Sequence, residues 1–430
     1  MVFHNQKKSK ETKSIKSQIR EFILPPLMFT SWYFLKRKIT PIKVDNCVKK
    51  LVFFSPHTSN PFGSKGDEAM LIALVNKLKV QNPDIELAIA VEPGAFVSPL
   101  KKLDVKPIEC WSYPWSLKNI FAHVKDYDAS ICIGADVMDG YYSDIKSLRL
   151  WLISDLMARH GKKTIIGGFS FNSLPATFTK LFLTKFISDK IIVNLRDSCS
   201  LKCYDQIARF DAKLVADNAF MLAPTLSKEV SDIKKWVEIQ KNNKRMVVIF
   251  NIHPILVPDR SKEKLTSMIN SCAQTVDFII SEYNASVLFV AHDFRDKNTG
   301  DVFMLNAIYS KCKSDKSYLS TVFNDIPASD LKGLASLADL VITGRMHLSI
   351  AALGSGVPIL GITYQDKFEG LIKHFELPSY VLASPEKIID ASFFKKFCEH
   401  GIHNVDELKK NVQSKVEVVS SLSEKNIRLI

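Results

Sequence analysis

Residues 340–363 read LVITGRMHLSIAALGSGVPILGIT. The apolar run 340–343 predicts a buried strand, 347–353 a short helix, and 359–363 a second strand. The glycines between Leu353 and Pro358 end this helix and lead into the next strand. A strand, a helix and a strand in this order predict two parallel strands joined by a crossover helix, and therefore an α/β fold.

The same alternation extends through most of the chain. Further strands are predicted at 51–54, 85–91, 129–133, 164–166, 191–194, 246–250 and 287–290, and further helices at 68–78, 148–158, 264–282 and 302–311. This pattern predicts two Rossmann-like domains that face a cleft. We expect a basic and apolar extension at 1–47, an N-terminal domain at 48–225, a linker or crossing helix at 226–245, a C-terminal domain at 246–385 and a helical tail at 386–430.

The positive charge is concentrated at the N-terminus. The 430 residues carry a net charge of +13, and residues 1–50 hold 12 Lys/Arg against 3 Asp/Glu, which leaves +4 for the rest. The body is therefore not a basic nucleic-acid-binding surface. Within the extension, the uncharged stretch 22–35 (FILPPLMFTSWYFL) lies before Lys36-Arg37-Lys38.

This apolar stretch has two interpretations. It is shorter than the ~20 residues that span a bilayer, and we expect Pro25-Pro26 to break a helix there. It suits an in-plane segment on an anionic membrane surface, and it equally suits a helix that docks on its own domain. The expected location is the cytoplasm, and the first interpretation adds peripheral attachment to the cytoplasmic face of the membrane.

Eight scattered cysteines occur without a CxxC pair. We expect buried, reduced thiols, no zinc site and no other metal site.

Candidate site residues follow the predicted strands, because ligands of open α/β sheets bind beyond the carboxyl ends of the strands. The first group lies in 55–68 (SPHTSNPFGSKGDE), where a helix begins and offers free N–H groups. The alternative is an ordinary loop in which Asp67 caps the helix. Asp136 follows the strand at 129–133 and is either a base or hydroxyl-binding acid, or part of an Asp-Gly turn.

Three cationic or titratable residues form the most specific candidate for a ligand-binding site. Arg345 and His347 lie where the strand at 340–343 meets its helix, and Lys367 follows the next strand. Arg196 occupies a similar position after the strand at 191–194 and either grips an anion or pairs with Asp197. These residue types predict a phosphate or carboxylate ligand that is bound without a metal.

Together these elements resemble the polysaccharide pyruvyl transferase family over roughly residues 50–385. The matching motifs are Gly66-Asp-Glu-Ala69, Gly134, Gly167-Gly-Phe-Ser170, Arg196-Asp-Ser198, Ala216-Asp217, Gly344-Arg-Met-His347, Gly356-Val-Pro358 and Tyr364-Gln-Asp-Lys367. The resemblance implies a GT-B-like fold. It also implies transfer of a pyruvyl group from phosphoenolpyruvate to two sugar hydroxyls of a surface polysaccharide precursor (exopolysaccharide or capsule), forming a cyclic ketal.

The resemblance further implies site roles. Arg196, Arg345 and Lys367 would bind phosphoenolpyruvate, and His347 would be the general acid. The base is Asp67 or Asp136, and the choice stays open. We assign Asn60, Gly66 and Glu68 to the acceptor. No cofactor is expected besides phosphoenolpyruvate as co-substrate, and the acceptor is a sugar or lipid-linked oligosaccharide.

Two other classes remain as alternatives. A GT-B glycosyltransferase with a nucleotide-sugar donor would share the run at 340–363, but no Glu for a donor ribose stands in 343–358. A membrane-recruited module that binds an anionic glycan would need no Arg345–His347 pair. Phosphate release, as opposed to nucleotide release, separates the two enzymes.

Overall fold

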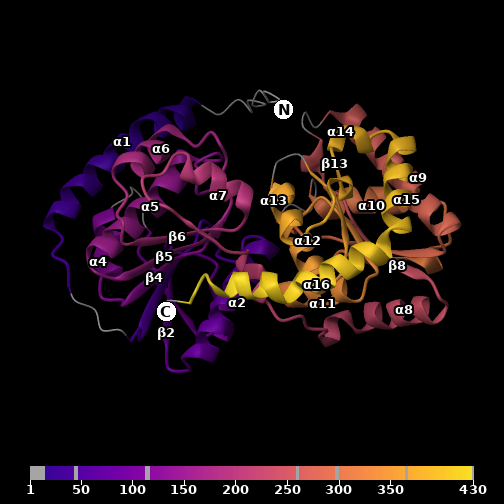
Figure 1. Cartoon of the computed structure of the whole chain (residues 1–430), viewed down its shortest axis with the longest axis horizontal. Coiled ribbons are helices and arrows are strands. Elements are labelled where there is room, and N and C mark those ends of the chain that lie inside the picture. Colours follow the sequence, from indigo (N-terminus) through magenta and orange to yellow (C-terminus); the bar gives the residue numbers. More distant parts are fainter. Residues whose placement is uncertain are drawn as a thin grey trace.

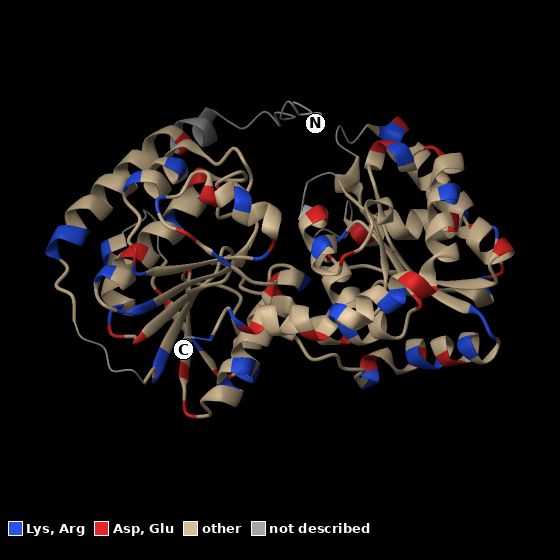
Figure 2. Ribbon diagram, in the orientation of Figure 1, with Lys and Arg blue, Asp and Glu red and all other residues tan. Residues whose placement is uncertain are grey.

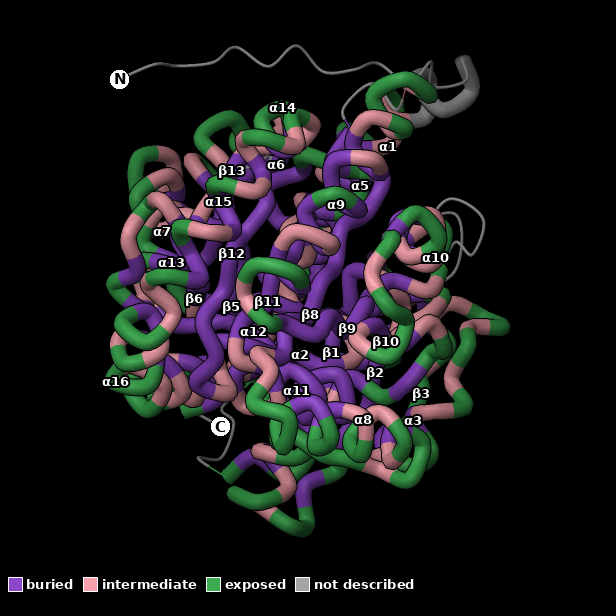
Figure 3. The backbone as a smooth tube through the Cα atoms, turned by 90° about the vertical axis from the view of Figure 1, so that its right-hand side faces the viewer, coloured by how far each residue is buried: buried purple, intermediate pink, exposed green. Residues whose placement is uncertain are grey.

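The computed structural model describes residues 15–42, 47–111, 117–257, 261–295, 300–363 and 367–428. Figure 1 shows two lobes side by side, each built on its own sheet with helices on both faces. The predicted α/β fold of two Rossmann-like domains is therefore confirmed. Strands form the buried centre of each lobe, and the green exposed segments of Figure 3 lie mostly on helices and loops.

The N-terminal sheet has seven parallel strands in the order β3-β2-β1-β4-β5-β6-β7. Its strands are β1 (Lys50–Phe54), β2 (Glu86–Val91), β3 (Val105–Glu109), β4 (Ala129–Cys132), β5 (Lys163–Phe169), β6 (Ile191–Leu195) and β7 (Lys213–Leu214). Its helices are α1 (Ile15–Lys38), α2 (Lys65–Gln81), α3 (Ser98–Lys102), α4 (Leu117–Val124), α5 (Asp144–Arg159), α6 (Thr177–Lys185) and α7 (Ser198–Asp205), with the 3-10 turn η1 (Asn218–Met221).

The C-terminal sheet has six parallel strands in the order β10-β9-β8-β11-β12-β13. Its strands are β8 (Met246–Asn251), β9 (Ala285–Val290), β10 (Leu319–Val322), β11 (Leu340–Thr343), β12 (Ile359–Ile362) and β13 (Leu382–Ala383). Its helices are α8 (Ser231–Asn242), α9 (Lys262–Glu282), α10 (Asp301–Lys311), α11 (Ala328–Ser336), α12 (Met346–Leu353), α13 (Lys367–His374), α14 (Pro385–Ile388), α15 (Ala391–His403) and α16 (Val405–Glu424). The remaining 3-10 turns are η2 (Lys228–Val230), η3 (Pro254–Leu256), η4 (Lys316–Tyr318) and η5 (Ser379–Val381).

In both sheets the strand order reverses beside the first strand, between β1 and β4 and between β8 and β11. Loops diverge at such a point and leave a crevice at the carboxyl ends of the strands. The two crevices supply the residues of the site described below.

The extension does not break at its two prolines, so that prediction was wrong. α1 runs through Pro25 and Pro26, and its inner face packs on α5. Met28 and Trp32 are buried there, and the indole of Trp32 donates to the carboxylate of Asp155 at 2.8 Å. Burial of two large side chains, worth ~1.5–3 kcal/mol each, is of the same size as the cost of two prolines inside a helix, at ~3 kcal/mol each. None of the helices among the described residues is long and apolar enough to span a bilayer.

The chain returns to its first lobe at the C-terminus. In Figure 1, α16 leaves the C-terminal lobe and ends beside the N-terminal one. The buried amide of Asn426 accepts from the Gly168 N–H at 2.7 Å and donates to the Ala216 carbonyl at 2.9 Å. Ser423 donates to the Asp217 carbonyl at 2.7 Å. The end of the chain therefore fixes loops that carry site residues.

All eight cysteines are free thiols, but the expected burial holds for only part of them. Five of them are buried, whereas Cys47 is exposed and Cys199 and Cys203 are partly exposed.

Candidate functional site

A cleft of about 720 Å³ lies between the two domains and is lined by loops from both. That volume falls within the ~300–1,000 Å³ typical of small-molecule sites. Six of the site residues predicted from the sequence line this cleft: Gly66, Asp67, Asp136, Arg196, Arg345 and His347.

Three predicted residues are not placed in the cleft. Asn60 accepts the Phe62 N–H at 3.1 Å and stabilises its own turn. Glu68 reaches across the domain interface, where it accepts the Ala328 N–H at 2.8 Å. The side chain of Lys367 lies outside the described residues, as does most of the motif that precedes it.

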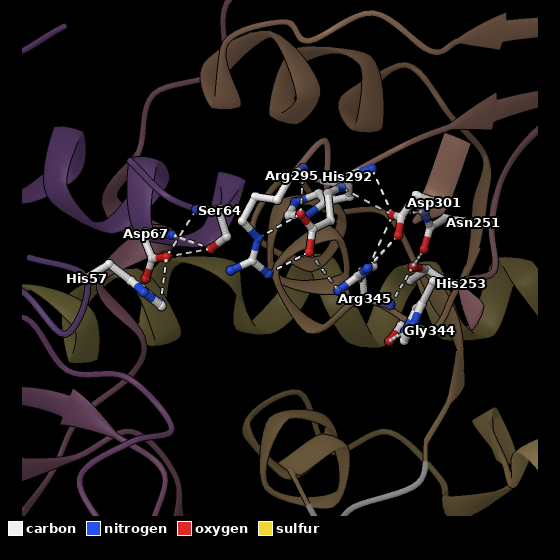
Figure 4. A network of polar contacts seen from close by, with 12 residues as sticks. His57, Ser64, Asp67, Asn251, His253, His292, Arg295, Asp301, Gly344 and Arg345 are labelled. Carbon is white, nitrogen blue, oxygen red and sulfur yellow. Dashed lines mark hydrogen bonds and ion pairs between the residues drawn. The ribbon is translucent and has the colours of Figure 1, made fainter. Parts of the chain in front are cut away.

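The guanidinium of Arg345 is held by two carboxylates of its own domain (Figure 4). Its Nε and Nη2 donate to Oδ1 of Asp301 at 3.1 and 2.5 Å, and Nη1 lies 3.4 Å from Oδ2 of Asp293. Asp301 is fully buried and also accepts the His292 N–H at 3.0 Å. Burial would raise the pKa of Asp301, but the charge of Arg345 and the hydrogen bonds from Arg345 and Asn251 hold it below its usual value.

Arg295 adds a second cation to this side of the cleft. It forms a forked pair with Asp293, with Nε and Nη2 at 2.9 and 2.6 Å from the two carboxylate oxygens. Burial acts to raise the pKa of Asp293, but the hydrogen bond from Arg295 and the charge of Arg345 lower it to about 2. In Figure 4 the guanidinium of Arg295 points toward the Ser64–Asp67 end of α2.

Arg196 provides a third cation from the N-terminal domain. It is almost fully buried, its Nη1 donates to Asp217 at 2.8 Å, and its Nε donates to Ser170 at 2.7 Å. The alternative pairing with Asp197 is wrong, because Asp197 caps α7 and accepts the Ser200 N–H. An Arg fixed in this way presents its remaining N–H groups without further loss of side-chain freedom.

His347 lies between the two domains. Its Nε2 is 3.8 Å from Oδ2 of Asp217, and its ring packs against Gly66 so closely that a Cβ there would overlap it. Burial lowers the pKa of His347, the negative charge of Asp217 acts to raise it, and Arg196 lowers it further. A negative charge that enters the cleft would therefore raise the pKa of His347 and favour its protonated form.

Asp67 takes part in capping α2, as one interpretation predicted, although it is not the N-cap residue itself. Ser64 is the N-cap, and it forms a capping box with Asp67, whose carboxylate accepts the Ser64 N–H at 3.2 Å. Oδ2 of Asp67 also lies 3.7 Å from His57 Nε2. Asp67 thus has both a structural partner and a place in the wall of the cleft.

Sequence reasoning missed the residues that follow β8 and β9. His253 and His292 are buried beside Arg345, and burial lowers the pKa of each to about 3. Nε2 of His253 lies 3.0 Å from the Gly344 carbonyl, so a neutral ring donates from that nitrogen. The signal was present, because Asn251, His253, His292 and Asp293 follow predicted strands, just as Arg345 does.

The arrangement favours an anionic ligand. Arg196, Arg295 and Arg345 converge with His347 on one cleft, and its lining residues among the described part of the chain include no group of three His, Cys, Asp or Glu placed to hold a metal ion. Cations pre-positioned by buried carboxylates can bind phosphate or carboxylate oxygens in a forked geometry.

Solved structures share the fold at low sequence identity. S. aureus MnaA in complex with UDP superposes with a TM-score of 0.56 and 11% identity, over 88% of this chain and 94% of that chain. HepE of Anabaena in complex with UDP-glucose gives 0.54 and 12%, over 87% and 98%. UDP-GlcNAc 2-epimerase from Neisseria meningitidis, bound to UDP-GlcNAc, gives 0.53 and 10%, over 88% and 99%. These matches support the GT-B-like fold.

Comparison of the sequence with known proteins identifies a family. No curated protein matches the chain. Residues 65–366 match the family described as polysaccharide pyruvyl transferase, a span that holds all six predicted residues that line the cleft. Because this span covers more than half of the sequence, the chain belongs to the polysaccharide pyruvyl transferase family.

Proposed function

We propose that this pyruvyl transferase takes its pyruvyl group from phosphoenolpyruvate and transfers it to two hydroxyls of one sugar, forming a pyruvate ketal. Pyruvyl transfer in polysaccharide synthesis follows from family membership. The observation that supports this donor and product is the convergence of Arg196, Arg345 and His347 on one cleft. Phosphoenolpyruvate carries a phosphate and a carboxylate, which match two guanidinium groups.

The histidine supplies the proton. Before the donor binds, burial holds the pKa of His347 below its ordinary value. The charge of bound phosphoenolpyruvate raises that pKa, so His347 becomes an imidazolium ion when the donor is present. It then protonates the methylene carbon, and positive charge develops at the adjacent carbon that carries the phosphate.

Two C–O bonds then form and one breaks. The first sugar hydroxyl adds to the cationic carbon and loses its proton to a base, for which Asp67 and Asp136 both remain candidates. The bond from carbon to the phosphate oxygen breaks, and the arginines stabilise the departing phosphate. The second hydroxyl closes the ring, and its proton leaves with the phosphate. The two protons lost from the sugar hydroxyls are matched by two gained, one on the methylene carbon and one on the departing phosphate, so the reaction balances.

We also propose that the enzyme uses α1 to bind an anionic membrane surface. Lipid-linked acceptors would be found at such a surface. The outer face of this helix carries Phe22, Leu27 and Phe34 at 82%, 58% and 59% exposure, although its inner face is buried. In Figure 2 the helix is mostly uncharged along the rim of its lobe and ends in blue at Arg37 and Lys38. An apolar face between basic ends suits the interface of anionic lipids.

One incubation tests the reaction. The purified protein is mixed with phosphoenolpyruvate and a panel of lipid-linked sugars, and phosphate release and product mass are followed. We expect release of one phosphate for each acceptor that gains one pyruvyl group. Parallel samples with UDP-sugars address the alternative glycosyltransferase, and UDP release without phosphate release would overturn the proposal.

A further inference from the structure

A second cavity of about 270 Å³ adjoins the cleft within the N-terminal domain. His57, Ser143 and Lys146 line both, so the two spaces are direct neighbours. The volume is far above the ~10–15 Å³ that holds one water molecule. It is therefore large enough for part of a ligand that also occupies the cleft.

The walls of this cavity are polar but balanced in charge. Lys146 and Arg149 face Glu21 and Glu92, so the cavity has no excess of cations for a second phosphate group. Thr58 donates to Glu92 at 2.5 Å, and the buried guanidinium of Arg149 lies 4.6 Å from the centre of the Trp111 ring. The wall therefore offers fixed hydrogen-bond acceptors (carboxylates), donors (guanidinium and ammonium groups) and hydroxyls. Such a mixture suits a neutral ligand with many hydroxyl groups.

An aromatic pair lies in the loop that leads to Ser143, and one of its two rings lines the cleft. Tyr141 and Tyr142 are 45% and 46% exposed, although large aromatic side chains are usually buried. Tyr142 lines the cleft, and the next residue, Ser143, lines both spaces. The buried carboxylate of Asp139 accepts the Tyr141 N–H at 2.8 Å, which fixes the loop. An exposed ring held in this way offers an apolar surface to the C–H face of a sugar.

We propose that the second cavity is a sugar subsite, which holds the neutral sugar adjacent to the one that is modified in the cleft. The inference rests on the proposed function, because it assumes that the acceptor sugar occupies the cleft. It makes the preferred acceptor a disaccharide or longer. It also gives α1 a second role, because Glu21 of this helix lines the subsite.

Filling the cavity tests the proposal through binding. Ser59 lines the second cavity but not the large cleft, and its exposed position makes Ser59→Tyr compatible with folding. Ser281→Tyr, at an exposed position of α9, is the matched control. Saturation-transfer NMR titrations compare lactose, cellobiose and mannobiose with the methyl glycosides of galactose, glucose and mannose.

We expect wild type and Ser281→Tyr to bind at least one disaccharide ~10-fold more tightly than its methyl glycoside, a factor that corresponds to ~1.4 kcal/mol. Ser59→Tyr should lose this preference and still bind phosphoenolpyruvate. A second variant, Lys146→Ala, should weaken the preference relative to Lys118→Ala, which changes an exposed lysine of α4.

The outcomes separate the two proposals. Equal binding of mono- and disaccharides by wild type, no binding of any of these sugars, or an unchanged preference in Ser59→Tyr would overturn the subsite. Loss of the preference in Ser59→Tyr supports the subsite even if wild type releases no phosphate from phosphoenolpyruvate. In that case only the proposed donor is wrong.

Discussion

At the scale of single residues, the proton donor gives the most direct prediction. His347→Gln keeps a polar side chain of similar size but cannot transfer a proton, so we expect kcat to fall by ~10²–10⁴. Phosphoenolpyruvate should bind almost as tightly, because Arg196 and Arg345 are unchanged. Time courses of phosphate release measure kcat, and calorimetric titration with phosphoenolpyruvate measures donor binding separately. Full activity in this variant would remove His347 from the mechanism.

The buried histidines make stability depend on pH. The pKa of His253 is lowered from 6.5 to about 3 by burial, so the unfolded chain binds a proton more readily than the folded one between these values. Stability is therefore complete above pH 6.5 and is lost as the pH falls toward 3. We expect the melting temperature to drop between pH 7 and pH 5, and His253→Gln, which keeps a donor for the Gly344 carbonyl, to reduce that drop.

Differential scanning fluorimetry across this range measures the effect, with the exposed His123→Gln as control. Asp293 does not interfere, because its pKa is lowered from 3.8 to about 2 and its contribution is lost only below pH 4. An equal drop in His253→Gln and wild type would show that another group is responsible.

The sequence predicted the site residues that follow strands in familiar motifs. Gly66, Asp67, Asp136, Arg196, Arg345 and His347 all line the cleft. Their partners could not be predicted, since Asp301 reaches Arg345 from 44 residues away and Asp217 reaches across to His347 in the other domain. Such pairs depend on tertiary packing, which a local pattern does not contain.

At the scale of elements, edge strands and α1 are the clearest differences from the prediction. β3 (VKPIE) and β10 (LSTV) lie at the edges of their sheets and lack the apolar runs of central strands, so they were missed. α1 was misjudged because local proline chemistry was given more weight than burial against α5. Of the two interpretations of this segment, docking on its own domain accounts for the inner face, and the outer face remains uncovered by the described residues.

The outer face of α1 carries the prediction about the membrane. Phe22→Ser with Leu27→Ser removes two exposed apolar side chains and leaves Met28 and Trp32 in place. We expect binding to phosphatidylglycerol vesicles to fall ~10–100-fold, or ~1.4–2.8 kcal/mol, because partial insertion of the two side chains gives only part of the ~1.5–3 kcal/mol that each contributes when fully buried. Flotation assays measure it, with Val80→Ser at an exposed position of α2 as the control.

Salt and lipid composition refine this test. Binding should weaken at high ionic strength and on phosphatidylcholine vesicles, because the basic ends of α1 respond to lipid charge. Unchanged flotation in the double variant would show that this face of α1 does not bind the membrane.

At the scale of the whole molecule, the two lobes are linked through the site itself. Asn426, at the end of the chain, holds the loops at Gly168 and Ala216, and His374 of α13 lies 2.7 Å from the Arg196 carbonyl. The residues from the two domains that would handle the donor are therefore positioned by contacts across the domain boundary. If the domains moved apart, Arg196 and Arg345 could no longer bind the same donor molecule. Changes that open the domains should therefore also lower kcat.

Gly66 tests this coupling, because it is the point where α2 touches the ring of His347. A Cβ at this position would overlap the ring, so Gly66→Ala should hold the domains apart, increase the radius of gyration in small-angle scattering, and lower kcat. Gly94→Ala is the control. Its φ of +73° makes alanine cost ~1–2 kcal/mol, but the new methyl group would meet no atom within 4 Å. We therefore expect Gly94→Ala to lower the melting temperature without changing the radius of gyration. If Gly66→Ala kept the compact radius and full activity, His347 could function without its contact to the N-terminal domain.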